Sequence, residues 1–110
     1  MIKYSFLATT SAVAAPSNMV GYRGNIGQSY IFLVTGSVSG AIWGTNIYTD
    51  DSNLGAAAVH AGVIQNNQAG LITVTMLAAQ SSYTSTTRYG ITSFSYGFWW
   101  GSYSITSATG

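Results

Sequence analysis

The sequence predicts an α+β domain, mainly β, in which one central helix is wrapped by short antiparallel strands. Three observations support this fold class. The chain has 110 residues, which suits one hydrophobic core and is too short for two. A single segment has helical periodicity. About six to eight short runs of aromatic and β-branched residues are separated by stretches rich in glycine, serine and threonine, as in a mainly β domain.

The helix is predicted at about residues 52–62. Leu54, Ala57, Ala58 and Ala61 recur at helical spacing and form one apolar stripe. Since most of these side chains are small, a sheet can approach the helix closely.

Charged and small residues predict where this helix begins and ends. Asp51 or Ser52 is expected to accept hydrogen bonds from the free N–H groups of the first turn. The adjacent carboxylates of Asp50 and Asp51 would also lie at the positive end of the helix dipole. Gly62 is suited to end the helix.

Alternation of side chains predicts the strands. In the segment 71–77, Ile72, Val74 and Met76 are expected to face the core. The segment 28–35 is predicted to be a buried strand, and Trp43 and Phe94 are assigned to the core. The segments expected to be extended are 2–8, 28–35, 71–77, 91–96 and 103–106.

Residues 1–20 are expected to form an apolar N-terminal arm ahead of a domain at residues 21–110. The alternative is a weak secretory signal, because Lys3 precedes an apolar stretch and the alanines before Pro16 resemble a cleavage site. No transmembrane segment is expected, because no window reaches the roughly 20 predominantly apolar residues that a membrane-spanning helix needs.

The charge and cysteine counts exclude several function classes. Only 5% of residues are charged and the net charge is +1, so binding to nucleic acid, which needs many lysines and arginines, is not expected. A net charge near zero favours association with partners. The absence of cysteine excludes disulfides, zinc–thiolate sites and thiol nucleophiles.

His60 is the only histidine and is expected to be a buried structural residue. A catalytic histidine needs an orienting partner, but Asp50 and Asp51 lie about 15 Å away at the far end of the predicted helix. These carboxylates could instead bind calcium, but that ion needs six to eight oxygens, so helix capping is preferred. The sequence therefore predicts no catalytic residue, no cofactor and no metal.

Aromatic residues exceed what a core of this size needs. Trp99 and Trp100 point to opposite faces if their segment is extended, so one of them is expected to be exposed. Together with Tyr96 and Tyr103 they could form a platform for a protein partner or for sugar rings.

Two motifs cover the predicted helix and the segment before it. They are W-G-x-x-x-Y-x-x-x-S and A-A-x-H-A-G, carried by Trp43, Gly44, Tyr48, Ser52, Ala57, Ala58, His60, Ala61 and Gly62. The motifs resemble the heart of the LCCL domain family, and the likeness extends over about residues 36–96. One departure is that Gly55 takes the place of the family's helix cysteine, so the usual disulfides are missing.

The resemblance implies a central helix wrapped by β-structure, in a non-enzymatic module found in extracellular proteins, some of which bind lipopolysaccharide. If this chain bound the phosphates of such a lipid, Arg23 and Arg88 would be the contacts. The sparse positive charge gives that activity little support.

We therefore expect a structural or interaction subunit of an ordered extracellular or viral assembly, such as a surface, decoration, tail or fibre protein. Its partners would be copies of itself or other subunits, held by aromatic contacts and by strand addition from the arm at 1–20. The alternative is a secreted or surface-exposed module that binds glycan or lipopolysaccharide. The expected location is extracellular, on a cell surface or in a virion.

Overall fold

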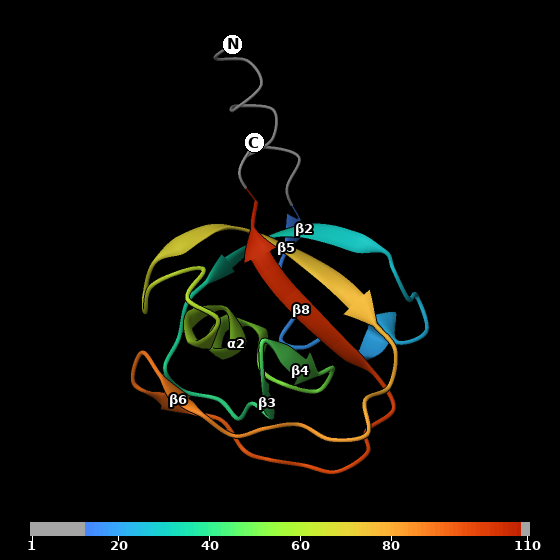
Figure 1. Cartoon of the computed structure of the whole chain (residues 1–110). Helices are drawn as coiled ribbons and strands as arrows, with labels where there is room; N and C mark the ends of the chain where they lie inside the picture. Colours follow the sequence, from blue (N-terminus) through green and yellow to red (C-terminus); the bar gives the residue numbers. More distant parts are fainter. Residues whose placement is uncertain (1–12, 109–110) are drawn as a thin grey trace.

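A computed structural model describes residues 13–108, and the strand predicted at 2–8 lies outside them. The described chain is mainly β with one α-helix, which confirms the predicted fold class (Figure 1). One sheet has six strands in the order β1-β2-β5-β8-β4-β3, and β6 pairs with β7 in a second, small sheet. The elements are β1 (Val13–Ala14), η1 (Val20–Tyr22), β2 (Ser29–Thr35), β3 (Gly44–Thr45), β4 (Ile47–Thr49), α2 (Leu54–His60), β5 (Ala69–Leu77), β6 (Thr87–Arg88), β7 (Ile91–Thr92) and β8 (Ser102–Ser107).

The strand β5 lies at the centre of the large sheet and pairs antiparallel with β2 on one side and β8 on the other. The pair β1–β2 is parallel, so the sheet is mixed and not wholly antiparallel. The described chain ends are close together. The N–H of Ala15 donates to Leu33 and that of Ala108 donates to Leu71, and these two leucines are paired across β2 and β5.

Alternation along the strands decides which side chains reach the core. In β5, Ile72, Val74 and Met76 are buried, as predicted. The prediction of a buried strand at 28–35 is wrong for most of its side chains, because Phe32 and Val34 are buried but Ile31 and Leu33 of β2 are exposed. An antiparallel sheet packed on one face shows this in-and-out pattern.

The helix α2 is shorter than the predicted segment 52–62. Its N-cap is Asn53, whose side chain accepts a hydrogen bond from the Ala56 N–H at 2.9 Å, so the prediction that Asp51 or Ser52 would cap it is wrong. The expected stop is correct. Gly62 has φ 79°, and Val63 donates to Ala58 in a Schellman motif, which satisfies the last carbonyl groups.

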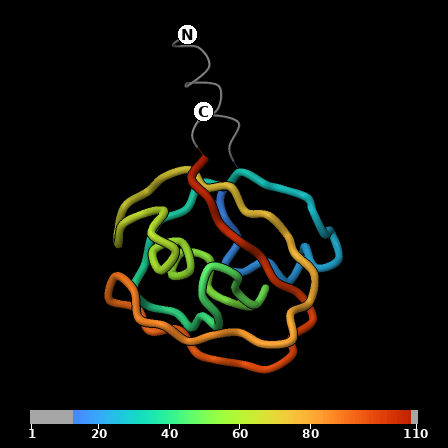
Figure 2. Tube along the Cα trace, viewed as in Figure 1, coloured from blue at the N-terminus to red at the C-terminus, as the bar shows by residue number. Residues whose placement is uncertain are grey.

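The chain between β5 and β8 forms one long, irregular hairpin, which Figure 2 shows running beneath the helix. Its two arms are joined at Gln80↔Trp99 and Tyr83↔Tyr96, in the same register as β6 and β7. Tyr89 and Gly90 form its turn, and both have positive φ, as a type I′ turn requires. Only Ile91–Thr92 of the predicted strand at 91–96 is a regular strand, because the rest of that arm pairs through single bridges.

The core lies between the large sheet, α2 and the hairpin. The prediction that Phe94 and Trp43 belong to this core is wrong for Phe94, which is exposed, while Trp43, which it contacts, is half-buried. In their place the hairpin contributes Ile91 to the core and also buries Ser93.

Residues 13–19 of the expected arm pack against the domain. Met19 is fully buried, and its N–H donates to the backbone carbonyl of Asp50. The carbonyl of Ser17 accepts from the Leu54 N–H. Between residues 13 and 108, no helix is both long and apolar enough to cross a membrane.

Candidate functional site

His60 is fully buried and forms a hydrogen bond through each ring nitrogen. Its Nδ1 lies 2.9 Å from the Tyr48 hydroxyl, and its Nε2 lies 3.0 Å from the carbonyl oxygen of Thr86. Because a carbonyl oxygen only accepts, Nε2 carries a proton and donates to Thr86, while Nδ1 faces the Tyr48 hydroxyl. Both nitrogens are therefore engaged inside the core, and neither faces a substrate.

Asp50 is a second buried polar residue, and it follows β4 directly. Its carboxylate accepts hydrogen bonds from Arg23 Nε at 2.7 Å, from Arg23 Nη2 at 2.8 Å and from Trp99 Nε1 at 2.8 Å. Burial raises the pKa of Asp50, but the hydrogen bonds from Arg23 and Trp99 outweigh this effect and leave the pKa below its ordinary value. Asp50 thus joins η1 to the hairpin and takes no part in capping α2.

Tyr103 is fully buried, so it does not belong to an exposed platform, contrary to expectation. Its hydroxyl donates to the carbonyl oxygen of Ser52 at 2.9 Å, and burial raises the pKa of Tyr103 well above its ordinary value. The Oγ of Ser52 accepts from the Trp43 N–H at 2.9 Å. Ser52 therefore organises the turn before the helix from inside the core.

Four aromatic side chains project from the returning arm of the hairpin, and we call them the aromatic strip. They are Phe94, Tyr96, Phe98 and Trp100, with exposed fractions of 54%, 48%, 51% and 64%. The rings of Phe98 and Trp100 are in edge-to-face contact, with centroids 4.8 Å apart. Trp100 is thus the exposed member of the tryptophan pair, because the neighbouring Trp99 turns inward to Asp50.

A pocket of about 190 Å³ lies beside this strip, and we call it the aromatic pocket. It is lined by Trp43, Thr49, Asp51, Tyr96 and Trp99. The rings of Tyr96 and Trp99 meet at 80° with their centroids 5.7 Å apart. Within residues 13–108, Oδ1 of Asp51 is a buried side-chain oxygen with no hydrogen-bond partner. Sequence reasoning placed Asp51 at the helix and so missed this pocket.

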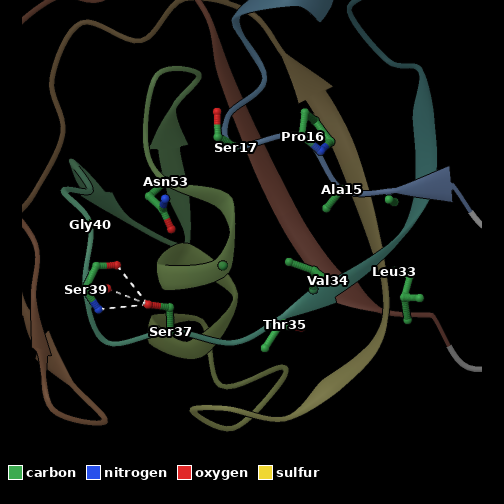
Figure 3. Close-up of a pocket in the computed structure, with 12 residues that line it drawn as sticks. Ala15, Pro16, Ser17, Leu33, Val34, Thr35, Ser37, Ser39, Gly40 and Asn53 are labelled. Atoms are coloured by element: carbon green, nitrogen blue, oxygen red, sulfur yellow. Dashed lines mark hydrogen bonds between the residues drawn. The ribbon is translucent and has the colours of Figure 1, made fainter.

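A larger cavity, of about 510 Å³, lies between the N-terminal segment, β2 and the start of α2 (Figure 3). Figure 3 shows Ser37 and Ser39 hydrogen-bonded to each other on one side, with Val34 and Leu33 on the other. The residues that line it are uncharged and include no aromatic ring, and Asn53 is committed to the helix cap. This cavity therefore offers little specific chemistry.

The two arginines considered for phosphate binding do not meet. Arg23 is paired with Asp50 near the base of the hairpin, and its guanidinium lies 5.5 Å from the centroid of the Trp99 ring. Arg88 lies beside the turn of the hairpin and donates to Asn46 Oδ1 at 2.8 Å. In the part of the chain that the structure describes, no cluster of three or more histidine or acidic side chains could hold a metal ion.

Comparison with known proteins identifies a family and a curated relative. Residues 34–103 match the family described as "LCCL domain". A human protein described as "Cysteine-rich secretory protein LCCL domain-containing 2" is 41% identical over 56 residues. This match spans 51% of the present chain but 11% of the human protein, so the chain corresponds to a small part of that relative.

Proposed function

Because the chain belongs to the LCCL domain family, we propose that it is an extracellular, non-enzymatic interaction module that builds an ordered assembly from copies of itself or with other subunits. LCCL domains are generally non-catalytic. Such an assembly could be a virion or a fibre, in which the chain would be a surface, decoration or tail subunit.

The observation that carries this proposal is the aromatic strip. Four half-exposed aromatic side chains lie within one arm of a hairpin, and a concentration of exposed apolar groups is typical of interaction sites. Aromatic side chains provide large contact areas at low entropic cost and are enriched in interface centres. No charged residue lies between positions 93 and 101, so this segment itself presents no charge to an uncharged surface of a second copy.

The outer face of β2 supplies a second apolar surface. Ile31 and Leu33 project from it, and Val13 of the adjacent β1 is also exposed. Among the described strands, β1 and β3 end the sheet order, so pairing with a neighbouring strand at an edge could extend the assembly. Two separate surfaces would permit contacts with more than one neighbour, as an ordered array requires.

Sedimentation velocity over a wide concentration range, from micromolar upward, tests the proposal. We expect the wild-type chain to sediment as a species larger than the monomer. The double variant Phe98→Ser, Trp100→Ser should shift toward the monomer. Tyr89→Ser is the matched control, because Tyr89 is 70% exposed and lies outside the aromatic strip. A wild-type chain that stays monomeric at every concentration would reject the proposal.

Glycan binding is the second candidate, and the exposure of Trp100 favours it, because an indole face can stack on a sugar ring. In that case the fluorescence of a monomeric chain would respond to simple sugars or to lipopolysaccharide, and Trp100→Ser would abolish the response. The engagement of Arg23 with Asp50 weakens the case for a phosphate-bearing glycolipid.

A further inference from the structure

We propose that the aromatic pocket binds a primary alkylammonium group, with Asp51 as its counter-charge and hydrogen-bond acceptor. The proposal rests on three features that coincide in the pocket: its aromatic walls, its net negative charge and its unpartnered carboxylate oxygen. Its chemistry differs from that of the aromatic strip, although Tyr96 belongs to both.

The walls of the pocket suit a cation. Three of its five lining residues are Trp43, Tyr96 and Trp99, and the faces of indole and phenol rings attract cations through their quadrupoles. Since the rings of Tyr96 and Trp99 stand at 80° to each other, they form a corner and not a flat stack. The guanidinium of Arg23 lies 5.5 Å from the centroid of the Trp99 ring and is paired with Asp50, so its charge is compensated there.

The charge balance leaves the pocket negative. Arg23 and Asp50 offset each other through two short hydrogen bonds, at 2.7 and 2.8 Å. Asp51 then contributes one further negative charge at the pocket wall. A neutral or anionic ligand would leave this charge uncompensated, whereas a cation would compensate it.

The unpartnered oxygen selects among cations. Among residues 13–108, Asp51 Oδ1 has no donor although it is buried, and an unsatisfied buried acceptor is unfavourable. A primary ammonium group has three N–H donors and can satisfy this oxygen through a charge-assisted hydrogen bond. A quaternary ammonium carries the same charge but has no N–H group, so it cannot donate a hydrogen bond to Asp51. The pocket volume of about 190 Å³ far exceeds the roughly 10–15 Å³ that a single water needs. The pocket therefore has room for an ammonium group together with part of its alkyl chain.

The test is a titration of the full chain followed by the indole N–H signals in ¹H–¹⁵N NMR spectra. The probes are n-butylammonium, tetramethylammonium as a cation without N–H donors, and n-butanol as a neutral analogue. We expect n-butylammonium to shift the signals of Trp43 and Trp99 at millimolar concentration. Tetramethylammonium should bind roughly tenfold more weakly, the ratio expected for one lost charge-assisted hydrogen bond, and n-butanol more weakly still. A lysine-containing peptide and phosphoethanolamine then distinguish a protein side chain from a lipid headgroup as the source of the ammonium.

Two variants identify the site. Asp51→Asn preserves the shape of the side chain and removes its charge, and we expect it to weaken n-butylammonium binding roughly tenfold. Tyr96→Ala removes one aromatic wall of the pocket and should also weaken binding, because the cation loses its attraction to that ring. Phe98→Ala is the matched control, since this exposed aromatic does not line the pocket. Unchanged binding in Asp51→Asn, or indole signals that n-butylammonium leaves unmoved, would overturn the proposal.

Discussion

Gly55 of α2 faces the carbonyl oxygen of Thr35 so closely that a β-carbon at position 55 would lie 2.7 Å from that oxygen. The atom that would have to move belongs to the backbone, at the end of β2. A side chain at position 55 would therefore force the helix and the strand apart.

Gly55→Ala should lower the free energy of unfolding by about 1 kcal/mol. Overpacking a close contact costs about 1–3 kcal/mol, and the better helix propensity of alanine returns only about 0.5–1 kcal/mol. Urea unfolding followed by circular dichroism measures the difference. Gly21→Ala is the control, because a β-carbon at Gly21 has open space around it. A Gly55→Ala variant as stable as the wild type would contradict the packing described.

The buried carboxylate of Asp50 predicts acid sensitivity. Because hydrogen bonds from Arg23 and Trp99 lower the pKa of Asp50 in the folded state, its stabilising effect is present above the unfolded pKa of about 3.9. This contribution is lost as the pH falls through the folded pKa. We expect Asp50→Asn to lose on the order of 2 kcal/mol at pH 7 and to show a flatter acid dependence.

Arg88→Gln is the control for this measurement, because Arg88 donates to Asn46 and belongs to no ion pair in the described chain. It should keep the acid dependence of the wild type. If the two variants responded alike to acid, the role assigned to the Arg23–Asp50 pair would be wrong.

The hydrogen bonds of His60 predict one tautomer. At neutral pH, ¹⁵N NMR should show the proton on Nε2, which faces the Thr86 carbonyl. Tyr48→Phe leaves Nδ1 without its donor and should lower the free energy of unfolding by about 1–3 kcal/mol. Tyr89→Phe, which removes a hydroxyl from an exposed side chain, should have no such effect. A proton on Nδ1 would contradict the network.

The buried Tyr103 predicts that the folded protein loses stability at alkaline pH. Burial raises its pKa, so its contribution to stability is complete below the unfolded pKa of about 10. The contribution is lost as the pH rises through the folded pKa. Tyr103→Phe should be less stable at pH 7, because Ser52 loses a donor, but its stability should fall less steeply above pH 10. Equal alkaline slopes for both chains would show that Tyr103 ionises without unfolding.

The sequence was most informative where periodicity decides the structure. Alternation located Ile72, Val74 and Met76 in the core, and the alanine stripe located the helix. The motif around His60 predicted the family that the comparison then showed.

Prediction failed where long-range partners override local preference. The adjacent carboxylates looked like a helix cap, but Asp50 pairs with Arg23, which lies 27 positions earlier in the chain. The composition did contain one indication of this ion pair. The chain has only five charged residues, so a carboxylate that becomes buried in the fold has to pair with one of the three cationic side chains. Phe94 could not be placed, because the irregular pairing of the hairpin does not follow a strand period.

The most direct measurement of the central claim is oxidative footprinting of the aromatic strip in dilute and in assembled protein, read by mass spectrometry. We expect the oxidation of Phe98 and Trp100 to decrease on assembly, while Tyr89, exposed at the hairpin turn, stays equally reactive. If Trp100 were oxidised as readily in the assembled protein as in the dilute chain, the aromatic strip would not be the interface.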